Sequence, residues 1–157
     1  MDMDLYAVAL FGHRDFWGHR KAEGELTKIL RALCESKACV EINIGRNGEF
    51  DVFAASAVKR LQKAVGEERL SLTLVLPYGC RDLLYYEKYY DSVIITEGKE
   101  VHPKRAITLK NRFMVEQADL VIGYVERKEG GAYAALQYAK KLNKPFINLA
   151  ETKEEEE

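Results

Sequence analysis

Short runs of hydrophobic residues alternate along the chain with longer segments in which apolar residues recur every three or four positions. The runs have the length of β-strands, and the first of them is apolar on both faces, as a central parallel strand is. The longer segments have the period of amphipathic helices. This alternation predicts an α/β fold with a Rossmann-like parallel sheet flanked by helices on both faces. The predicted strands are residues 5–11, 40–44, 71–76, 92–96, 119–125 and 145–149, and the predicted helices are residues 21–36, 52–64, 81–90, 103–117 and 132–142.

Local signals refine where these elements begin and end. Asp51 is well placed to cap the helix predicted over residues 52–64. Pro103 opens the fourth helix, because the fixed φ of proline suits a first turn. Pro77 ends the third strand, since proline cannot donate to the hydrogen-bond ladder.

The length of 157 residues and the 47% hydrophobic content indicate one domain, residues 1–150, with a core that needs no disulfide or metal. The tail at 151–157 holds five glutamates and one lysine, and we expect it to be disordered. No apolar run approaches the roughly 20 residues of a membrane span, and the N-terminus lacks the basic start of a signal peptide. We therefore expect a soluble, cytoplasmic protein with no membrane partner.

The charge of the chain leads to an expectation about a second class of partner. The chain has 24 basic and 25 acidic residues, and this balance argues against a general nucleic-acid binder, so we expect no nucleic-acid partner. Without the tail, 23 basic and 20 acidic residues remain, which suits one small anionic ligand. Cys34, Cys39 and Cys80 are odd in number and match no metal motif, so we expect reduced thiols, no metal ion and no cofactor.

Glycines follow three of the predicted strands. In an open parallel sheet, ligands bind beyond the carboxyl ends of the strands, where glycine lets backbone N–H groups approach a phosphate and helix N-termini add positive charge. Strand-to-helix turns also need glycine for their own geometry. The turns contain Gly12 and Arg14 after the first strand, Gly45, Arg46 and Gly48 after the second, and Gly130 and Gly131 after the fifth. Three such turns on one edge favour a small phosphate-bearing ligand.

Better-known signatures are absent from the sequence. There is no GxxxxGK[ST] loop, no GxGxxG fingerprint and no GxSxG elbow. His13, His19 and His102 have no metal-ligand spacing with the cysteines.

Five segments together resemble the SLOG superfamily, in the small single-domain form found in bacteria and their phages. They read ALFGHRDF, NIGRNGEFDVFA, LVLPY, NRFMVEQADLVIGYV and GGAYAALQYAKKLNKPFINL. The resemblance implies a Rossmann-like fold that binds nucleotides or nucleotide-derived ligands, and it favours a homodimer or larger homo-oligomer. Relatives in that superfamily include the Lonely Guy phosphoribohydrolases and ligand-sensing domains of bacterial defence systems.

The resemblance also implies site residues. Carried over by motif, these are Gly12, Arg14, Gly45, Gly48, Asp51, Arg112, Met114 and the phosphate-facing turn Gly130, Gly131 and Ala132. One departure matters: phosphoribohydrolases carry PGGxGTxxE, whereas this chain reads EGGAYAALQ. Gln137 replaces the glutamate and cannot act as a carboxylate base. Glu49 and Asp51 are the remaining carboxylate candidates, although their interpretation as a loop residue and a helix cap is favoured over a catalytic role.

Three hypotheses therefore stay open. The leading one is a module that binds a nucleotide or phosphoribosyl ligand as a sensor or sequestering protein. The second is an N-glycosidase that hydrolyses nucleoside phosphates, and the third is a structural protein without a ligand. Tyrosines in residues 85–90 either stack on a base or pack against the core or a partner, and Trp17 either covers a nucleotide or caps the core.

Overall fold

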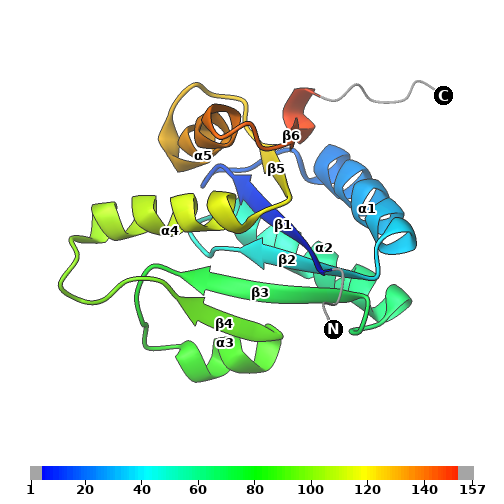
Figure 1. Ribbon diagram of the computed structural model, residues 1–157, viewed down its shortest axis with the longest axis horizontal. Helices are drawn as coiled ribbons and strands as arrows, with labels where there is room; N and C mark the ends of the chain where they lie inside the picture. Colours follow the sequence, from blue (N-terminus) through cyan, green and yellow to red (C-terminus); the bar gives the residue numbers. More distant parts are fainter. Residues whose placement is uncertain (1–4, 152–157) are drawn as a thin grey trace.

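A single sheet of six parallel strands forms the centre of the computed structural model, which describes residues 5–151 (Figure 1). The strands are β1 (Leu5–Gly12), β2 (Cys39–Ile44), β3 (Leu70–Leu76), β4 (Ser92–Ile95), β5 (Leu120–Tyr124) and β6 (Phe146–Asn148). The helices are α1 (His19–Ser36), α2 (Glu49–Val65), α3 (Leu83–Tyr89), α4 (Pro103–Gln117), α5 (Gly130–Lys141) and a short 3-10 helix, η1 (Leu149–Glu151). The predicted fold class is confirmed.

The strand order is β4-β3-β2-β1-β5-β6. The chain builds outward from β1 to β4 and then returns to the other side of β1 with β5 and β6. β1 therefore has β2 on one side and β5 on the other, and this reversal is the topological switch point at which α/β sheets bind ligands.

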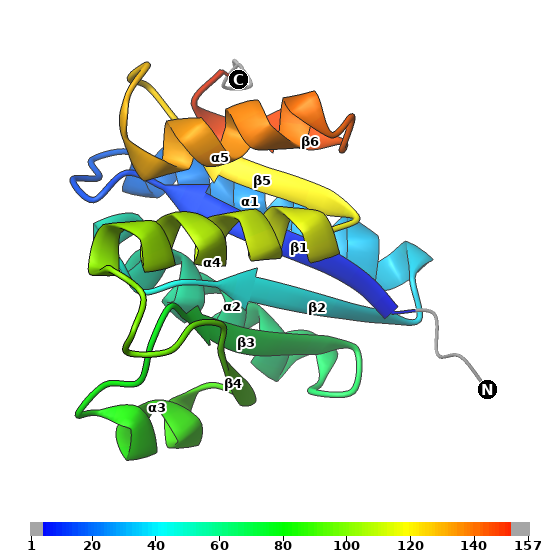
Figure 2. The same ribbon diagram turned by 60° about the vertical axis from the view of Figure 1, so that its left-hand side comes forward.

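The helices cover both faces of the sheet, with α4 and α5 in front and α1 and α2 behind (Figure 2). Apolar residues of α1 and α2, such as Leu26 and Phe50, form one buried core with the sheet. The opposite core contains Met114 of α4 with Ala135 and Leu136 of α5. Buried apolar area on both faces is the main stabilising contribution expected for such a three-layer domain.

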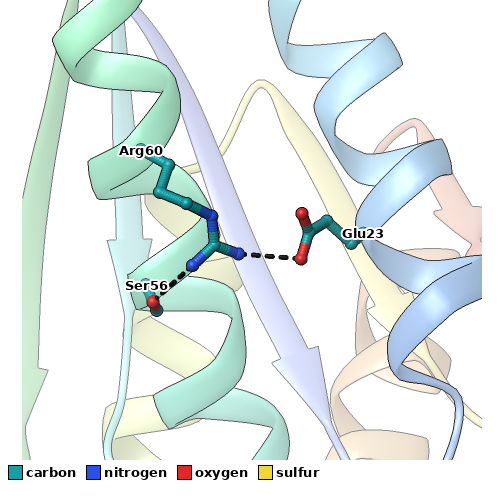
Figure 3. A network of polar contacts seen from close by, with 3 residues as sticks. All are labelled: Glu23, Ser56 and Arg60. Carbon is teal, nitrogen blue, oxygen red and sulfur yellow. Dashed lines mark hydrogen bonds and ion pairs between the residues drawn. The ribbon is translucent and has the colours of Figure 1, made fainter.

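A surface network links α1 to α2. Arg60 donates hydrogen bonds to Glu23 at 2.7 Å and to Ser56 at 2.8 Å (Figure 3). Because both partners of the ion pair are about half exposed, the network contributes roughly 1 kcal/mol or less. It fixes the two helices against each other outside the core.

Three helices begin earlier than the sequence predicted, and the first of them, α1, starts at His19 rather than at residue 21. α2 starts at Glu49 rather than at residue 52, so Asp51 lies inside its first turn and is not the N-cap, which is Gly48. Its carboxylate accepts a hydrogen bond from the backbone N–H of Asn47 at 2.9 Å. α5 starts at Gly130, which places both glycines of the turn within the helix. α2 and α5 both begin at or directly after a glycine whose own backbone is not helical: Gly48 is extended, with φ of −175°, and Gly130 has φ of +89°.

The remaining expectations concern the chain ends and the cysteines. The tail predicted over 151–157 falls mostly outside the described residues; Glu151 itself ends η1. Within the described chain the three cysteines are free, with Cys34 buried and Cys80 exposed. Among those same residues, no helix has both the length and the apolar character needed to cross a membrane.

Candidate functional site

A cavity of about 480 Å³ opens at the carboxyl edge of the sheet, around the ends of β1 and β2 and the loop that follows β5. Its volume lies within the range of small-ligand sites. Its walls come from the loops after these strands, from one face of α4 and from the start of α5. The lining residues are Leu10, Phe11, Gly12, His13, Arg14, Gly45, Asn47, Asp51, Ile107, Lys110, Asn111, Arg127, Glu129, Gly130, Gly131 and Ala132.

The first turn of α5 forms one end of the cavity. Gly130 has φ of +89°, a left-handed conformation that favours glycine. The N-cap residue Glu129 makes no side-chain hydrogen bond to the helix, so the first N–H groups of α5 have no side-chain cap. Uncapped N–H groups and the helix dipole favour negative charge at such a helix end, and Arg127 lines the same cavity.

His13 holds the loop that leads into this turn. Its Nε2 accepts hydrogen bonds from the backbone N–H groups of Glu126 at 2.9 Å and Arg127 at 3.2 Å. An acceptor at Nε2 requires the neutral ring with its proton on Nδ1. Burial and, next, the charge of Arg127 lower the pKa of His13 below its ordinary value of 6.5, which maintains that neutral form.

Lys110 and Asp51 form the other end of the cavity. Lys110 projects from α4 toward β2 and is 1% exposed, yet its Nζ makes no hydrogen bond or ion pair within residues 5–151. Burial lowers the pKa of Lys110, while the charge of Asp51 opposes that change. Burial raises the pKa of Asp51, against the opposing effects of the Asn47 N–H, Lys110 and Arg46.

Gly45 makes room for this buried amine. A Cβ at this position would lie 2.6 Å from Nζ of Lys110 and 3.4 Å from Oδ2 of Asp51. Any side chain here would therefore displace the Lys110 amine. Gly45 therefore leaves space for the Lys110 amine, in addition to any space that it leaves for a ligand.

Asn111, next to Lys110 on α4, carries an unsatisfied group. Its Oδ1 is buried and has no hydrogen-bond partner within the described chain. Its Nδ2 lies 3.4 Å from the place where a Cβ of Gly131 would stand, so the amide borders the start of α5. A buried acceptor without a partner is unfavourable unless something else donates to it.

The two loops at the cavity mouth are tied to each other. The N–H of Glu49 donates to the carbonyl of Arg14 at 2.9 Å, and the N–H of Phe16 donates to the Glu49 carboxylate at 3.3 Å. Gly48 packs so closely that a Cβ would lie 2.4 Å from Cα of Arg14. Glu49 and Gly48 therefore hold the mouth together and do not line the cavity.

Arg46 points away from the cavity, toward α3. It donates hydrogen bonds to the hydroxyls of Tyr86 and Tyr90, both at 3.1 Å, and its guanidinium lies 4.8 Å from the centre of the Tyr86 ring. These tyrosines accordingly pack within the fold, whereas Tyr85 is exposed. The arginine expected to bind phosphate thus connects the second turn to α3.

Arg112 and Met114 also lie outside the cavity lining. The Arg112 guanidinium sits over the Tyr138 ring at 5.3 Å, and Met114 is buried in the core beneath α4. Trp17 does not cap the core, because it is 86% exposed. The structure therefore brings together at the cavity Gly12, Arg14, Gly45, Asp51, Gly130, Gly131 and Ala132. Ligand binding by these residues stays a prediction.

The sequence analysis missed Lys110 and Asn111, although one signal could have identified the lysine. Ala106, Lys110 and Met114 recur every four residues and are all buried, so Lys110 occupies a core position of an amphipathic helix. A lysine at such a position needs a specific explanation, since lysine is almost never fully buried without a partner. His13 and Arg127 were not foreseen either, because their roles depend on the path of the loop.

Comparisons with known proteins establish the fold. No family model matches the sequence, and no curated protein matches it. Among solved structures, DNA processing protein A from Helicobacter pylori aligns with a TM-score of 0.63 at 17% identity, over 90% of this chain and 63% of that protein. The same protein from Streptococcus pneumoniae gives 0.67 at 18% identity, over 90% and 49%. The chain thus spans less than two thirds of either protein.

The molybdenum cofactor carrier protein of Chlamydomonas reinhardtii is also similar, with a TM-score of 0.56 at 13% identity, over 90% of this chain and 74% of that one. These neighbours correct one expectation. The exclusion of a nucleic-acid partner is wrong, because DNA processing protein A from Helicobacter pylori, which shares this fold, is a single-stranded DNA binding protein. Overall charge balance does not describe a local surface, and it was the only argument for that exclusion.

Proposed function

We propose that the cavity binds a nucleotide or nucleotide-derived phosphoribosyl ligand, and that the chain is a sensor or sequestering module of the SLOG type. The sequence resemblance and the position of the cavity at the switch point both support this proposal. The observation that carries it is the buried Oδ1 of Asn111, which has no hydrogen-bond partner in the described chain and lies in a cavity that the buried amine of Lys110 also lines.

A phosphate fits the α5 end. The uncapped N–H groups of Gly131 and Ala132 can donate to its oxygens, and Arg127 and Arg14 lie at the same cavity. The planar guanidinium group of arginine can also donate two parallel hydrogen bonds to a phosphate. Gly130 matters here because its left-handed backbone starts α5 at the cavity lining.

A ribose fits the opposite end. Hydroxyl groups both donate and accept hydrogen bonds. Asp51 offers an acceptor and Lys110 a donor at this end, and Asn111 Oδ1 offers a further acceptor nearer the start of α5. A ligand that carries a phosphate at one end and hydroxyls at the other would satisfy the buried groups that the protein leaves unsatisfied.

A thermal-shift panel tests this proposal. It should contain mononucleotides, cyclic nucleotides, ADP-ribose and a short single-stranded oligonucleotide. A ligand at a hundredfold excess over its Kd stabilises the native state by about 2.7 kcal/mol, or a rise in Tm of roughly 5–10 °C. Lys110→Met should abolish the shift, whereas Lys104→Met, at an exposed site on the same helix, should retain it. If nothing in the panel shifts the native chain, the proposal fails and the structural hypothesis gains.

A second candidate is hydrolysis of the N-glycosidic bond. Its support is Asp51, a carboxyl in the cavity whose pKa is raised by burial and which lies beside Lys110. Such a group can donate a proton to a leaving base. Chromatography of the same ligands after incubation tests for free base, and Asp51→Asn should abolish its release. Intact ligand throughout would contradict the hydrolase and leave the binding module.

The resemblance also favours a homodimer or larger homo-oligomer. Analytical ultracentrifugation of the full chain measures its mass in solution. A monomer at all concentrations would contradict this part of the proposal.

A further inference from the structure

The amine of Lys110 has an environment that a simple hydrogen-bond donor does not require. It is buried at the end of a cavity, beside a carboxyl group, and no acceptor within the described chain holds it. A structural lysine in a core normally forms an ion pair, because an unpaired buried charge is costly. Lys110 is therefore a desolvated amine at the end of a cavity, and burial lowers its pKa against the opposing charge of Asp51.

We propose that Lys110 forms an imine with a phosphate-bearing aldehyde held in the cavity, of which an open-chain sugar phosphate is the fitting class. This inference rests on the proposed function for the phosphate end of the site and goes beyond it at the other end. Lysines that form imines are typically made nucleophilic by desolvation in an apolar pocket. Burial of Lys110 lowers its pKa in that direction.

Geometry sets the class of ligand. The proposed anion end at Gly130 and Gly131 follows β5, whereas the amine of Lys110 lies beside Gly45, which follows β2, so the two are on either side of β1 in the cavity. A reacting molecule must therefore present its phosphate and its carbonyl carbon at opposite ends. In an open-chain pentose 5-phosphate the aldehyde is C1 and the phosphate is on C5, which meets this requirement within about 480 Å³.

The reaction balances with the groups present. The neutral amine attacks the carbonyl carbon, a C–N bond forms, and one amine proton passes to the carbonyl oxygen to give a carbinolamine. Asp51, whose pKa is raised by burial, donates its proton to the hydroxyl group, which leaves as water. The nitrogen lone pair closes the C=N bond, and the proton on nitrogen returns to the Asp51 carboxylate. The sum is amine plus aldehyde to imine plus water, with no oxidant or reductant.

Reductive trapping tests this inference. The full chain is incubated with ribose 5-phosphate and sodium borohydride, which reduces an imine to a stable secondary amine, and the modified lysines are mapped by peptide mass spectrometry. Lys104 is the internal comparison, since it is exposed on the same helix. Because the cavity would hold the aldehyde carbon of a phosphate-bearing ligand against its amine, Lys110 should label at least about tenfold faster than Lys104.

Two controls separate the parts of the inference. Ribose without the phosphate should label Lys110 no faster than Lys104, because the anion end would not position it. Asp51→Asn should slow trapping at Lys110, and Lys110→Arg should remove one adduct from the intact mass while Lys104→Arg leaves it. Circular dichroism checks that each variant is folded; if Lys110→Arg is not, the comparison of two lysines within the native chain still decides.

Equal labelling of Lys110 and Lys104 by ribose 5-phosphate would overturn the inference. Equal labelling of Lys110 by ribose and ribose 5-phosphate would overturn the assignment of a phosphate-bearing aldehyde. Neither result affects the thermal shift by mononucleotides, which tests the proposed function separately. A nucleotide shift without trapping at Lys110 would therefore contradict this inference alone.

Discussion

Gly12 lies where β1 meets α2, and replacing it with alanine should destabilise the fold strongly. A Cβ at this position would lie 2.0 Å from Cγ, 2.4 Å from Cδ2 and 2.5 Å from Cβ of Phe50. Non-bonded carbons prefer separations of about 3.5–4.0 Å. Phe50 or β1 would have to move by about 1.5 Å to relieve the overlap.

Phe50 has no room for such a movement. Its side chain is fully buried and packs against the ring of Phe16, with centroids 5.2 Å apart. The clash also includes Cβ of Phe50, so rotation of the ring cannot remove it. Overpacking of a core costs about 1–3 kcal/mol, and we expect Gly12→Ala to lie at the upper end, about 3 kcal/mol.

Gly24→Ala is the matched control. Gly24 lies inside α1, and no atom stands within 4 Å of the place its Cβ would occupy. Alanine in a helix interior is more favourable than glycine by about 1 kcal/mol, so this variant should be more stable than the native chain. The same substitution is thus expected to have opposite signs at the two sites.

Urea denaturation followed by circular dichroism measures both effects, provided the slope m stays constant. In a thermal melt, Gly12→Ala should lower Tm by about 6–12 °C. If Gly12→Ala unfolds within about 0.5 kcal/mol of the native chain, the close packing of β1 against α2 is incorrect.

Three further predictions concern the site. The pKa of His13 is lowered in the folded state, so its contribution to stability is complete above its ordinary pKa of 6.5 and is lost as pH falls. His13→Gln keeps a hydrogen-bond acceptor but does not titrate in this range. The unfolding free energy of this variant should therefore fall less between pH 7.5 and 5 than that of the native chain. Gly45→Ala should displace the Lys110 amine and weaken nucleotide binding in calorimetry, with stability little changed. Arg46→Lys should lower the unfolding free energy by about 1–2 kcal/mol, because lysine cannot bridge two tyrosine hydroxyls, and nucleotide affinity should stay the same. The first prediction is contradicted if His13→Gln has the same pH dependence of stability as the native chain. The second is contradicted if Gly45→Ala binds the nucleotide as tightly as the native chain, and the third if Arg46→Lys binds it more weakly.

The architecture could be predicted from the sequence because it depends on periodicity. Residues 5–11 and residues 103–117 have unambiguous patterns, and the structure places β1 and α4 there. The predicted start of α2 was wrong because an aspartate such as Asp51 is equally suitable as the N-cap and as a residue of the first turn. Only packing, which buries Asp51 next to Lys110, decides between these positions.

The site was harder to predict because motifs fix residue types but not helix faces. The motif comparison selected Arg112, whereas the side chain that borders the cavity is Lys110. Two residues along an α-helix correspond to a rotation of about 200°, so the two side chains point to nearly opposite sides. Arg112 consequently lies over Tyr138, outside the cavity. The glycine turns were placed correctly because they follow directly from the ends of the strands.

The hydrogen bonds between the two loops at the cavity mouth have a thermodynamic consequence. Glu49 and Arg14 are joined through the backbone, and Phe16 is joined to the Glu49 side chain, so the mouth has its shape before any ligand enters. A preorganised mouth loses little conformational entropy on binding. We expect calorimetry to show association without the large unfavourable entropy of loop ordering, and a rate of association that depends on diffusion and local charge rather than on a conformational change.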